Sequence, residues 1–417
     1  MAEQYPWPPV DGYRQRLHHL IAGLGAAGDV EALALDRRPA GVERGPVAAR
    51  PGVLDVVAVD PGAWRGPRDW LGEWARGGPP RRLLEVDWSA MAAELLTRLR
   101  DAPPVDLIWY SHVDTWFPLH QVVRHSGVAQ PASIVDFDNL ENLAMRLRRR
   151  TPPRFAPDAG LGGRGATLAR WAVSRGFDLV DERRWDRLQR QCASQVEHVV
   201  VCSELDLERS RCANAVVVGN GAVAPEQVHT DRSSLRGEAP TMFFVGALDY
   251  EPNTEAVEWF VREVLPAVRA RVPGARLRVV GRGAEQVAWV HDVDGVDLVG
   301  PVEDLSAELD RADLSVVPIR VGAGTRLKVV EALANHLPLV TTTVGCEGID
   351  LTDGVDARIA DDATSFAAAC AELLADGEQR QRLADAGAEL FARRYDWAGI
   401  EARVADLARS TVSSGRG

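Results

Sequence analysis

Short apolar runs alternate with helical patterns along the whole chain. In the first half, apolar runs occupy residues 30–35, 53–59, 105–111, 133–137, 199–203 and 215–218, with helical patterns between several of them at 13–24, 90–99 and 183–195. In the second half, runs at 241–245, 276–280, 314–319 and 339–343 alternate with helical patterns at 254–271, 305–312, 326–335 and 363–375. Continuous apolar runs of this length are typical of parallel strands that are buried on both faces. The alternation therefore predicts an α/β fold.

The alternation falls into two blocks, which predicts two doubly wound domains. A chain of 417 residues also exceeds what a single core usually supports. We assign residues 1–223 to a first domain and 240–394 to a second, joined by the polar segment 224–239. Residues 395–417 are expected to form a helix that crosses back onto the first domain.

The chain contains 48 basic residues, of which a single one, Lys328, is a lysine. Lysine and arginine differ in shape and hydration, so one lysine in so arginine-rich a chain indicates a position that needs a compact ammonium. Lys328 follows an apolar run and a Gly-X-Gly loop at 322–324, and a helical pattern begins beside it. A strand, a glycine loop and a helix N-terminus form an arrangement suited to anions. The alternative is a chance lysine on a solvated helix face.

The residues around Lys328 extend this prediction. Lys328 and Glu331 are three apart and share one helix face. Thr325 is the predicted N-cap, and the amides of Gly322 to Arg326 would meet a phosphate together with the two basic side chains. Glu331 could accept hydrogen bonds from the cis-diol of a ribose. The alternative for Glu331 is an exposed ion pair with Lys328.

Charge and composition exclude several classes of protein. The net charge of −12 lies entirely in the second half: residues 1–213 hold 28 acids and 28 arginines, and the remainder holds 32 acids against 20 basic residues. Duplex nucleic acid is therefore a poor partner. No run of eighteen apolar residues suggests a membrane span, and the first ten residues contain neither a basic residue nor an apolar signal region. The five cysteines lack metal-ligand spacing and are interpreted as reduced thiols of a cytoplasmic protein.

One basic cluster stands out in the first half. It comprises Arg146, Arg148, Arg149, Arg150 and Arg154, and it runs into a Pro/Gly-rich stretch at 151–165. The first interpretation is a solvated helix end followed by a surface loop. The second is a contact for an anionic acceptor or for membrane headgroups.

Four ordered motifs resemble those of the group-1 (family 4) retaining glycosyltransferases. Residues 322–334, followed by 337–348, resemble the donor-site signature of that family, and residues 244–260 resemble the opening strand and helix of its second domain. Residues 279–283 and 299–304 resemble two further loops in the expected order. The resemblance is strong over roughly residues 195–395 and weaker in the first half. It implies the GT-B fold, in which two facing Rossmann-like domains hold a nucleotide sugar in the cleft between them.

The resemblance also implies roles for individual residues. Arg326 and Lys328 would hold the donor diphosphate and act in catalysis. The other donor-binding positions would be Gly12, Gly246, Gly281, Arg282, Val302, Gly322, Ala323, Gly324, Thr325 and Glu331. Among these, Glu331 would bind the ribose hydroxyls and Val302 would line the base pocket.

Two departures from the family pattern matter. The paired-glutamate motif of the family places a second acid eight residues before Glu331, where this chain has Ala323. Many members also carry an arginine and a lysine in the loop that corresponds to residues 247–253, which contains neither here. A non-catalytic nucleotide-sugar-binding protein or a pseudo-glycosyltransferase of the same fold is therefore the alternative. A phosphorylase would need a lysine for pyridoxal phosphate, and the only lysine is Lys328.

The first half offers further candidates. Residues 8–12 resemble the loop after the opening strand of such domains, where Gly12 would let the backbone approach the donor phosphates; the alternative is a simple turn. Only seven residues precede this loop, so the first strand looks clipped. His112 follows the run at 105–111, where α/β folds place ligands, and by analogy could hydrogen-bond the donor sugar or the departing phosphate. The alternative for His112 is a satisfied polar residue.

Asp136 and Asp138 end the next apolar run and could face the acceptor. Asp136 as a general base is a weaker alternative, because the front-face route proposed for retaining transferases of this kind uses the leaving phosphate as the base.

We therefore predict a retaining glycosyltransferase that moves a sugar from a nucleoside diphosphate to an acceptor in carbohydrate or natural-product biosynthesis. UDP is the most common donor nucleotide in the family. Neither a metal nor another cofactor is expected, because no Asp-x-Asp motif lies at the donor site and cations with helix dipoles would meet the diphosphate. The acceptor could be a small molecule, a glycan or a lipid-linked compound, and membrane association stays open.

Overall fold

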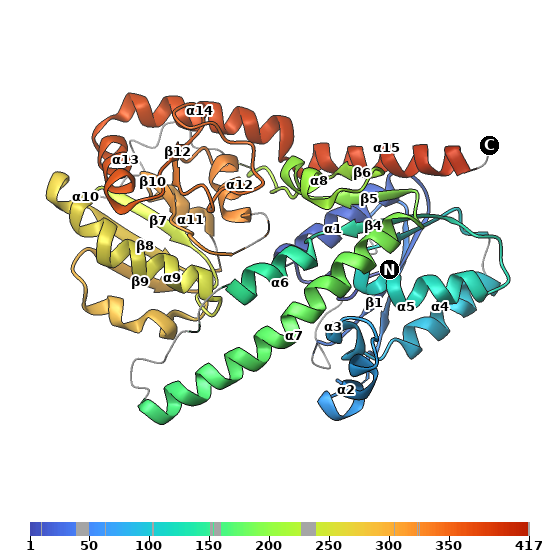
Figure 1. Ribbon diagram of the computed structural model, residues 1–417. Helices are drawn as coiled ribbons and strands as arrows, with labels where there is room; N and C mark the ends of the chain where they lie inside the picture. Colours follow the sequence, from blue (N-terminus) through green and yellow to red (C-terminus); the bar gives the residue numbers. More distant parts are fainter. Residues whose placement is uncertain are drawn as a thin grey trace. The chain divides into compact units, whose positions relative to one another are not determined.

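The computed structural model describes residues 1–417 except 10, 39–49, 63, 102–103, 151–152, 154–159, 227–238, 304, 323, 325 and 416–417. The chain forms two compact units, one comprising Met1–Val218 with Glu401–Gly417 and the other Gly219–Ile400. Each unit combines parallel β-strands with helices (Figure 1). The predicted α/β class with two parallel-sheet domains is therefore confirmed. Most of the predicted linker at 224–239 lies outside the described residues.

The second unit is built on a six-stranded parallel sheet in the order β12-β11-β10-β7-β8-β9. Its strands are β7 (Thr241–Val245), β8 (Arg276–Val280), β9 (Val296–Gly300), β10 (Leu314–Val317), β11 (Leu339–Thr341) and β12 (Arg358–Ile359). The strand order reverses between β7 and β10, so the sheet has a topological switch point there, which is where open α/β sheets bind ligands. The strands predicted at 241–245 and 276–280 have the predicted bounds, whereas β9 and β12 were not predicted.

The helices of the second unit follow the strands in alternation. They are α9 (Glu251–Trp259), α10 (Leu265–Arg271), α11 (Leu305–Asp310), α12 (Leu327–Ala334), α13 (Ala363–Ala375) and α14 (Gly377–Arg394), with a 3-10 segment at Ala284–Asp292. The helix predicted at 254–271 is interrupted by a π-helical turn, Phe260–Val264. Pro266 follows this turn and has no backbone N–H to continue an α-helical ladder, which accounts for the interruption.

The apolar face of α12 fixes the orientation of this helix. Val329, Val330 and Leu333 are fully buried in the main core of the second unit. Leu333 also packs against α14, where a side chain at Gly387 would lie 2.8 Å from the Cδ2 atom of Leu333. Because residues three or four apart share a helix face, this packing leaves Lys328 and Glu331 half-buried at the edge of the core.

The first unit contains a two-stranded and a four-stranded parallel sheet. The first pairs β1 (Val30–Leu35) with β2 (Val53–Val59), and the second has the order β3-β4-β5-β6, with β3 (Leu107–Tyr110), β4 (Ala132–Phe137), β5 (His198–Val201) and β6 (Ala215–Val217). Met1 and Ala2 lie between the two sheets. Ala2 pairs with β1 through its amide and carbonyl. The carbonyl of Met1 accepts from the Ser111 amide, and the N-terminal ammonium of Met1 donates to the Trp109 carbonyl at 2.6 Å. Two residues thus pair at the position where the prediction placed an opening strand.

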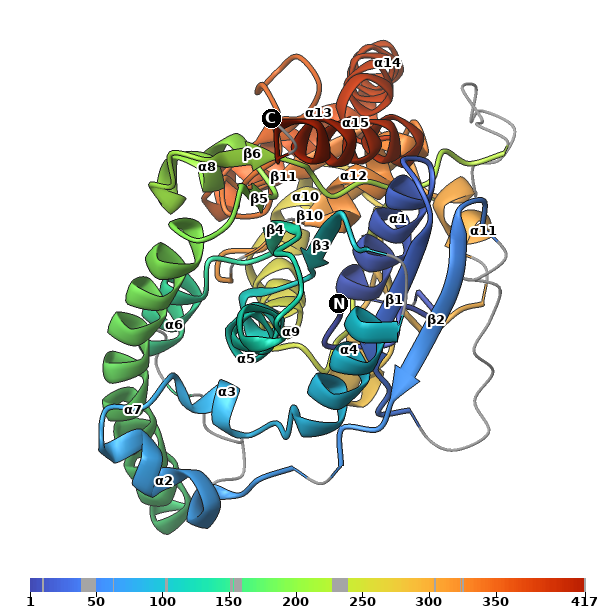
Figure 2. The same cartoon turned by 90° about the vertical axis from the view of Figure 1, so that its right-hand side faces the viewer.

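The helices of the first unit are α1 (Gly12–Gly25), α2 (Pro67–Ala75), α3 (Arg81–Leu84), α4 (Ser89–Asp101), α5 (Val113–His125), α6 (Glu141–Arg150), α7 (Leu161–Ala193), α8 (Glu204–Ser210) and, from Glu401 onward, α15 (Trp397–Gly415). Figure 2 shows β1 beside α1 and α4. The C-terminal helix packs closely on α1, because a methyl group at Gly23 would lie 2.8 Å from the Cβ atom of Val404. His19 on α1 also contacts Glu401 at 2.7 Å.

Helix α7 corrects two predictions. It spans 33 residues and begins at Leu161, so residues 161–165 are helical and do not belong to a surface loop, and the helix predicted at 183–195 is only its last part. The glycines of its first turns lower the intrinsic helix propensity, which is why the pattern was missed. Helix α6 packs along α7. Among the described residues, no helix is long and apolar enough to cross a membrane.

This packing also explains part of the basic cluster. Arg146 and Arg149 both contact Glu182, at 2.8 and 2.9 Å, and Arg148 contacts Asp178 at 2.6 Å. Three of the five arginines therefore pair with carboxylates of α7, and Arg154 lies outside the described residues. These pairs join α6 to α7, and the side chain of Arg148 remains 53% exposed.

Candidate functional site

Lys328 lies in the first turn of α12, next to the switch point of the second sheet. Its ammonium donates a hydrogen bond of 2.7 Å to the side-chain oxygen of Asn253. It also lies 4.4 Å from the centre of the Phe244 ring, on β7. Asn253 is itself fixed, because its amide nitrogen donates to the carbonyl of Ala247 at 2.8 Å. A neutral amide and an aromatic face thus hold the only lysine of the chain.

Two glycines create the space for this ammonium. A methyl group at Gly246 would lie 2.8 Å from both the Lys328 Nζ and the Asn253 Nδ2. Gly281, after β8, has a φ of +149°, and a methyl group there would lie 1.9 Å from the Gly246 carbonyl oxygen. The backbones that follow β7 and β8 can therefore touch only because both residues are glycines. The structure brings the predicted residues Gly246, Gly281 and Lys328 together.

Arg326 is the second cation at this position. It occupies the N-cap of α12, one residue after the predicted cap Thr325, and its side chain is buried. Thr325 and Ala323 lie outside the described residues. Gly322 has a φ of +122°, and a methyl group there would lie 2.7 Å from a guanidinium nitrogen of Arg326. Gly324 also has a positive φ, +88°. Gly322 therefore lies close against the Arg326 guanidinium.

The electrostatics of this cluster favour an anion. Burial, together with the nearby Arg326, lowers the pKa of Lys328 to about 7, against an opposing effect of Glu331. Burial also lowers the pKa of Arg326, which Tyr250 and Glu347 raise. Two cations in a desolvated position repel each other, and an anionic ligand would remove that repulsion. Burial raises the pKa of Glu331, while Lys328 lowers it.

The remaining donor-side residues lie on the neighbouring loops. Arg282 is mostly exposed and donates to Asp249 at 3.1 Å. Val302 is half-buried and packs against a small apolar cluster that includes Val280. Asn253, in the first turn of α9, and Tyr250, its N-cap, were not predicted as site residues, because a contact between residues 75 positions apart leaves no periodic signal in the sequence.

In the first unit, His112 is the N-cap residue of α5 and is buried. Its Nδ1 lies 3.1 Å from the Asp114 carboxylate and 3.4 Å from the Asp114 amide, and its Nε2 lies 3.5 Å from Glu141. Burial alone would lower the pKa of His112, but Asp114 and Glu141 raise it to about 9, against a smaller opposing effect of Arg82. His112 is therefore an imidazolium at neutral pH.

The carboxylates around His112 also bind Arg82. Its guanidinium contacts Asp114 at 2.7 Å, Glu3 at 3.0 Å and Glu141 at 3.1 Å. Glu3, His112 and Asp114 have the spacing of a metal site, with ligand atoms within 4.8 Å of one another. Because Arg82 already neutralises Glu3 and Asp114, the geometry does not call for a metal there.

Asp136 has a different position from the one predicted. Both of its carboxylate oxygens accept hydrogen bonds of 2.7 Å from Arg16 on α1, and both side chains are only 1% exposed. Arg16 also lies 3.7 Å from Asp138 and donates to the carbonyl of Val218. Burial raises the pKa of Asp136, whereas Arg16 lowers it. This geometry argues against Asp136 as a general base and for a structural ion pair between α1 and β4.

Gly12 is the first residue of α1, after the N-cap Asp11, whose side chain accepts from the Arg14 amide at 2.9 Å. Gly12 therefore lies at the start of a helix, directly after the predicted loop at residues 8–12. Gly12, His112, Asp136 and Asp138 belong to the first unit, and the other predicted site residues belong to the second.

The sheet with its switch point and the adjacent pair of cations defines an α/β domain that is suited to a phosphate-bearing ligand. Residues 239–376, which contain all of this cluster, match the model of the family described as "Glycosyl transferases group 1". The predicted family resemblance is therefore confirmed for the second unit.

Solved structures agree with the fold of the whole chain. The chain is similar to sucrose-phosphate synthase from Thermosynechococcus elongatus, with a TM-score of 0.68, 17% identity, and coverage of 99% of this chain and 98% of the other. It is also similar to Anabaena HepE in complex with UDP and glucose, with a TM-score of 0.61, 13% identity and 98% coverage of both chains. These matches confirm the GT-B fold. The predicted enzyme class, a glycosyltransferase, rests on the family match of residues 239–376.

A curated relative is 27% identical over 135 residues: an uncharacterized 44.6 kDa protein in the cps region of Klebsiella pneumoniae. The match covers 30% of this chain and 35% of the relative, so the chain spans about a third of the length of that relative.

Proposed function

We propose that the protein is a retaining glycosyltransferase that transfers a sugar from a nucleoside diphosphate, UDP in the first instance, to an acceptor hydroxyl. The observation that carries this proposal is the Lys328 ammonium, which a neutral amide holds beside a second cation at the switch point of a Rossmann-like sheet. Anabaena HepE, which has the same fold, was solved with UDP and with UDP-glucose. That likeness supports UDP as the first nucleotide to test.

The diphosphate would lie at the N-terminus of α12. Its negative charge would be met by Lys328, by Arg326 and by the free amides of the first helical turn. When the bond between the anomeric carbon and the phosphate oxygen breaks, further negative charge develops on the leaving diphosphate. Fixed cations in a desolvated position stabilise that charge without reorganisation. Arg326 and Lys328 would therefore lower the barrier to departure, and no metal is required in this scheme.

Retention of configuration would follow from attack on the face that the diphosphate leaves. The acceptor hydroxyl would form the new bond to the anomeric carbon and transfer its proton to the departing phosphate oxygen. This route needs no enzymic base, in agreement with the commitment of both Asp136 oxygens to Arg16. His112, an imidazolium at neutral pH, would be suited to donating a hydrogen bond to the donor sugar or phosphate.

Glu331 would bind the ribose. It lies one turn deeper than Lys328 on the same helix face and is half-buried. A carboxylate there could accept from both ribose hydroxyls, and the charge of Lys328 favours its ionised form.

In this proposal the transfer reaction is a step of carbohydrate biosynthesis. The Klebsiella relative is described by its place in a cps region, and that description supports a role in polysaccharide assembly.

A thermal-shift panel of UDP, GDP, ADP and TDP sugars tests the donor, because a ligand that binds only the native state raises its stability. We expect the largest increase in Tm with a UDP-sugar. Release of UDP from that sugar, including slow hydrolysis, should persist in EDTA. Binding without any turnover would instead support the alternative, a non-catalytic nucleotide-sugar-binding protein.

A further inference from the structure

The first unit contains a large hollow that the proposed reaction does not use. It encloses about 860 Å³ and is lined by side chains of α2, α3, α6 and α7. Ligand pockets for small molecules have volumes of this order. Much of its wall is apolar or aromatic, formed by Trp70, Leu71, Met145, Val173, Phe177 and Trp185. Val173 and Leu71 are 62% and 43% exposed, so the hollow presents apolar surface that no described side chain covers.

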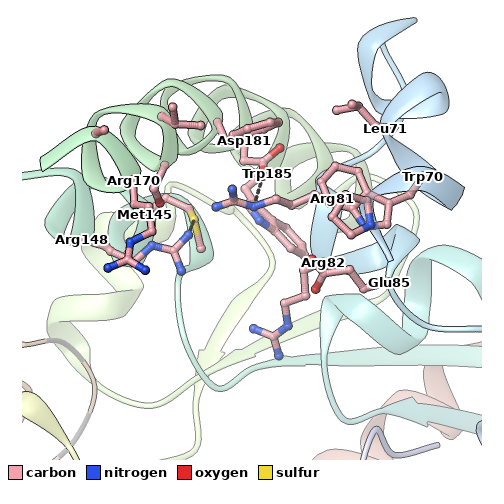
Figure 3. Close-up of a pocket in the computed structure, with 15 residues that line it drawn as sticks. Trp70, Leu71, Arg81, Arg82, Glu85, Met145, Arg148, Arg170, Asp181 and Trp185 are labelled. Atoms are coloured by element: carbon pink, nitrogen blue, oxygen red, sulfur yellow. Dashed lines mark hydrogen bonds and ion pairs between the residues drawn. The ribbon is translucent and has the colours of Figure 1, made fainter. Parts of the chain in front are cut away.

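The two ends of the hollow differ in character. Figure 3 shows Arg148 and Arg170 beside Met145 at one end, with Trp70 and Leu71 at the other. The side chain of Arg148 is 53% exposed, and Arg170 is also exposed. The end beside Met145 is therefore cationic and the end beside Trp70 is aromatic, and Arg81, Arg82 and Glu85 add further charged groups to the lining.

Carboxylates lie near these arginines, but they are buried beneath them. Asp178 accepts from Arg148 at 2.6 Å and also binds Arg81, and Asp181 lies 3.2 Å from Arg81. The side chains of Asp178 and Asp181 are each only 2% exposed. Four arginines, Arg81, Arg82, Arg148 and Arg170, line the hollow against two carboxylates, Glu85 and Asp181, so a ligand would meet an excess of guanidinium groups.

The aromatic end is held in place before any ligand binds. The Trp74 indole donates to Asp181 at 2.8 Å, and its ring lies 4.8 Å from that of Phe177, centre to centre. Trp70 lies 6.3 Å from Phe177 in an edge-to-face arrangement. A wall that is already ordered loses little conformational entropy when it binds a ligand.

We propose that this hollow binds a single-chain anionic amphiphile. Its phosphate or carboxylate group would lie against Arg148 and Arg170, and its apolar chain would run along Phe177 towards Trp70. The charge of the exposed arginines selects an anion, and the length of apolar wall selects a chain and not a free ion. This site lies within the first unit and does not depend on the proposed sugar transfer.

Dodecyl phosphate, used below its micelle concentration with the full chain, tests the proposal. Trp70 and Trp185 line the hollow, so saturable binding should change the tryptophan fluorescence of the protein. Dodecyl maltoside, which has the same chain without the charge, and inorganic phosphate, which has the charge without the chain, should each bind at least about tenfold more weakly. Equal binding of either control would overturn the proposal.

Two variants locate the binding site. Val173→Asp places a carboxylate in the apolar wall, and Arg170→Ala removes an exposed guanidinium; each should weaken dodecyl phosphate binding at least about tenfold. The matched controls are Val355→Asp, which alters a valine that is 54% exposed in the second unit, and Arg100→Ala, which alters an exposed arginine of α4. Neither control should change the affinity. If Val173→Asp failed to fold, as judged by circular dichroism, Arg170→Ala would decide alone.

Anionic vesicles distinguish the amphiphile from a membrane surface. Binding to phosphatidylglycerol vesicles without any binding of monomeric dodecyl phosphate would overturn the proposal in favour of a membrane-docking surface. The absence of binding to both would overturn it as well.

Discussion

Lys328 occupies a position that a guanidinium could not. Its ammonium lies against the Phe244 ring and so close to Gly246 that a methyl group there would be 2.8 Å away. A compact ammonium fits this space, whereas the larger planar fork of an arginine would have to displace the loop after β7. This steric limit gives a physical reason for the only lysine in a chain with 48 basic residues.

The first prediction follows from this limit. Lys328→Arg keeps the charge but should lower kcat/KM for UDP-sugar turnover by at least about tenfold, because the guanidinium cannot reach the same phosphate oxygens. Donor hydrolysis measures the effect, and Arg271→Lys, an exchange at an exposed position outside the cluster, is the control. Wild-type turnover in a folded Lys328→Arg protein would show that the site needs only a positive charge.

The second prediction concerns pH. The pKa of Lys328 is about 7 in the free protein, so the side chain is neutral in most molecules at pH 8. A bound diphosphate favours the ammonium form and raises this pKa, so UDP binding at pH 8 should take up a proton, and the affinity should fall as pH rises above 7. Calorimetry in buffers of different ionisation enthalpy measures the uptake. Lys328→Met should abolish it; the same uptake in that variant would assign the proton to another group.

The chemistry of individual residues was only partly predictable. The arginine-rich composition and the glycine loop predicted that Lys328 and Arg326 bind an anionic ligand. The partner of Lys328, Asn253, could not be predicted, because 75 positions separate the two and only the folded sheet brings them together. Asp136 was interpreted from its place at a strand end, but its partner Arg16 comes from a helix 120 positions earlier.

The contact between the loops after β7 and β8 depends on Gly281. Its φ of +149° is unfavourable for other residues, and a methyl group would lie 1.9 Å from the Gly246 carbonyl. Gly281→Ala should therefore lower the free energy of unfolding by about 3 kcal/mol or more, from backbone strain and overpacking together. Urea unfolding measures the loss.

Gly274 provides a control that separates these two effects. It has a φ of +87° but open space around its Cα, so Gly274→Ala should cost only the strain, about 1 kcal/mol. Equal losses in both variants would mean that the close approach of the two loops contributes nothing.

The ion pair between α1 and β4 gives a further prediction. Asp136→Asn leaves the buried Arg16 charge without a carboxylate and should destabilise the protein by about 3–5 kcal/mol. The exposed pair Arg190–Asp186 is the control, since Asp186→Asn should cost less than about 1 kcal/mol. A stable Asp136→Asn protein that has lost only turnover would instead favour the general-base role.

Strand positions were predicted well and helix limits less well. The runs at 30–35, 53–59, 241–245 and 276–280 match β1, β2, β7 and β8, because each strand places several apolar residues in a core. β12 has only two residues, too few to leave such a signal. The start of α7 was missed because the glycines of its first turns lower the local helix propensity.

The fold of the entire chain followed from alternation and motif order, and similarity over 98–99% of the chain to solved structures bears it out. The uneven distribution of charge also bears on how the second unit would select an anionic ligand. The second unit carries most of the excess acid. The two cations of its anion site therefore lie in a unit whose overall charge repels anions. Selectivity for a diphosphate must come from the local geometry at α12 and not from the overall field.

Calorimetric titration of UDP into the wild-type protein and into Lys328→Ala at pH 7 tests the central claim most directly. The account predicts saturable binding of one UDP per chain, weakened by about 1.5–3 kcal/mol in Lys328→Ala, with the unfolding transition of the variant preserved. Equal affinity for UDP in both proteins would contradict the account. The absence of binding of UDP and of every other nucleoside diphosphate to the wild-type protein would contradict it as well.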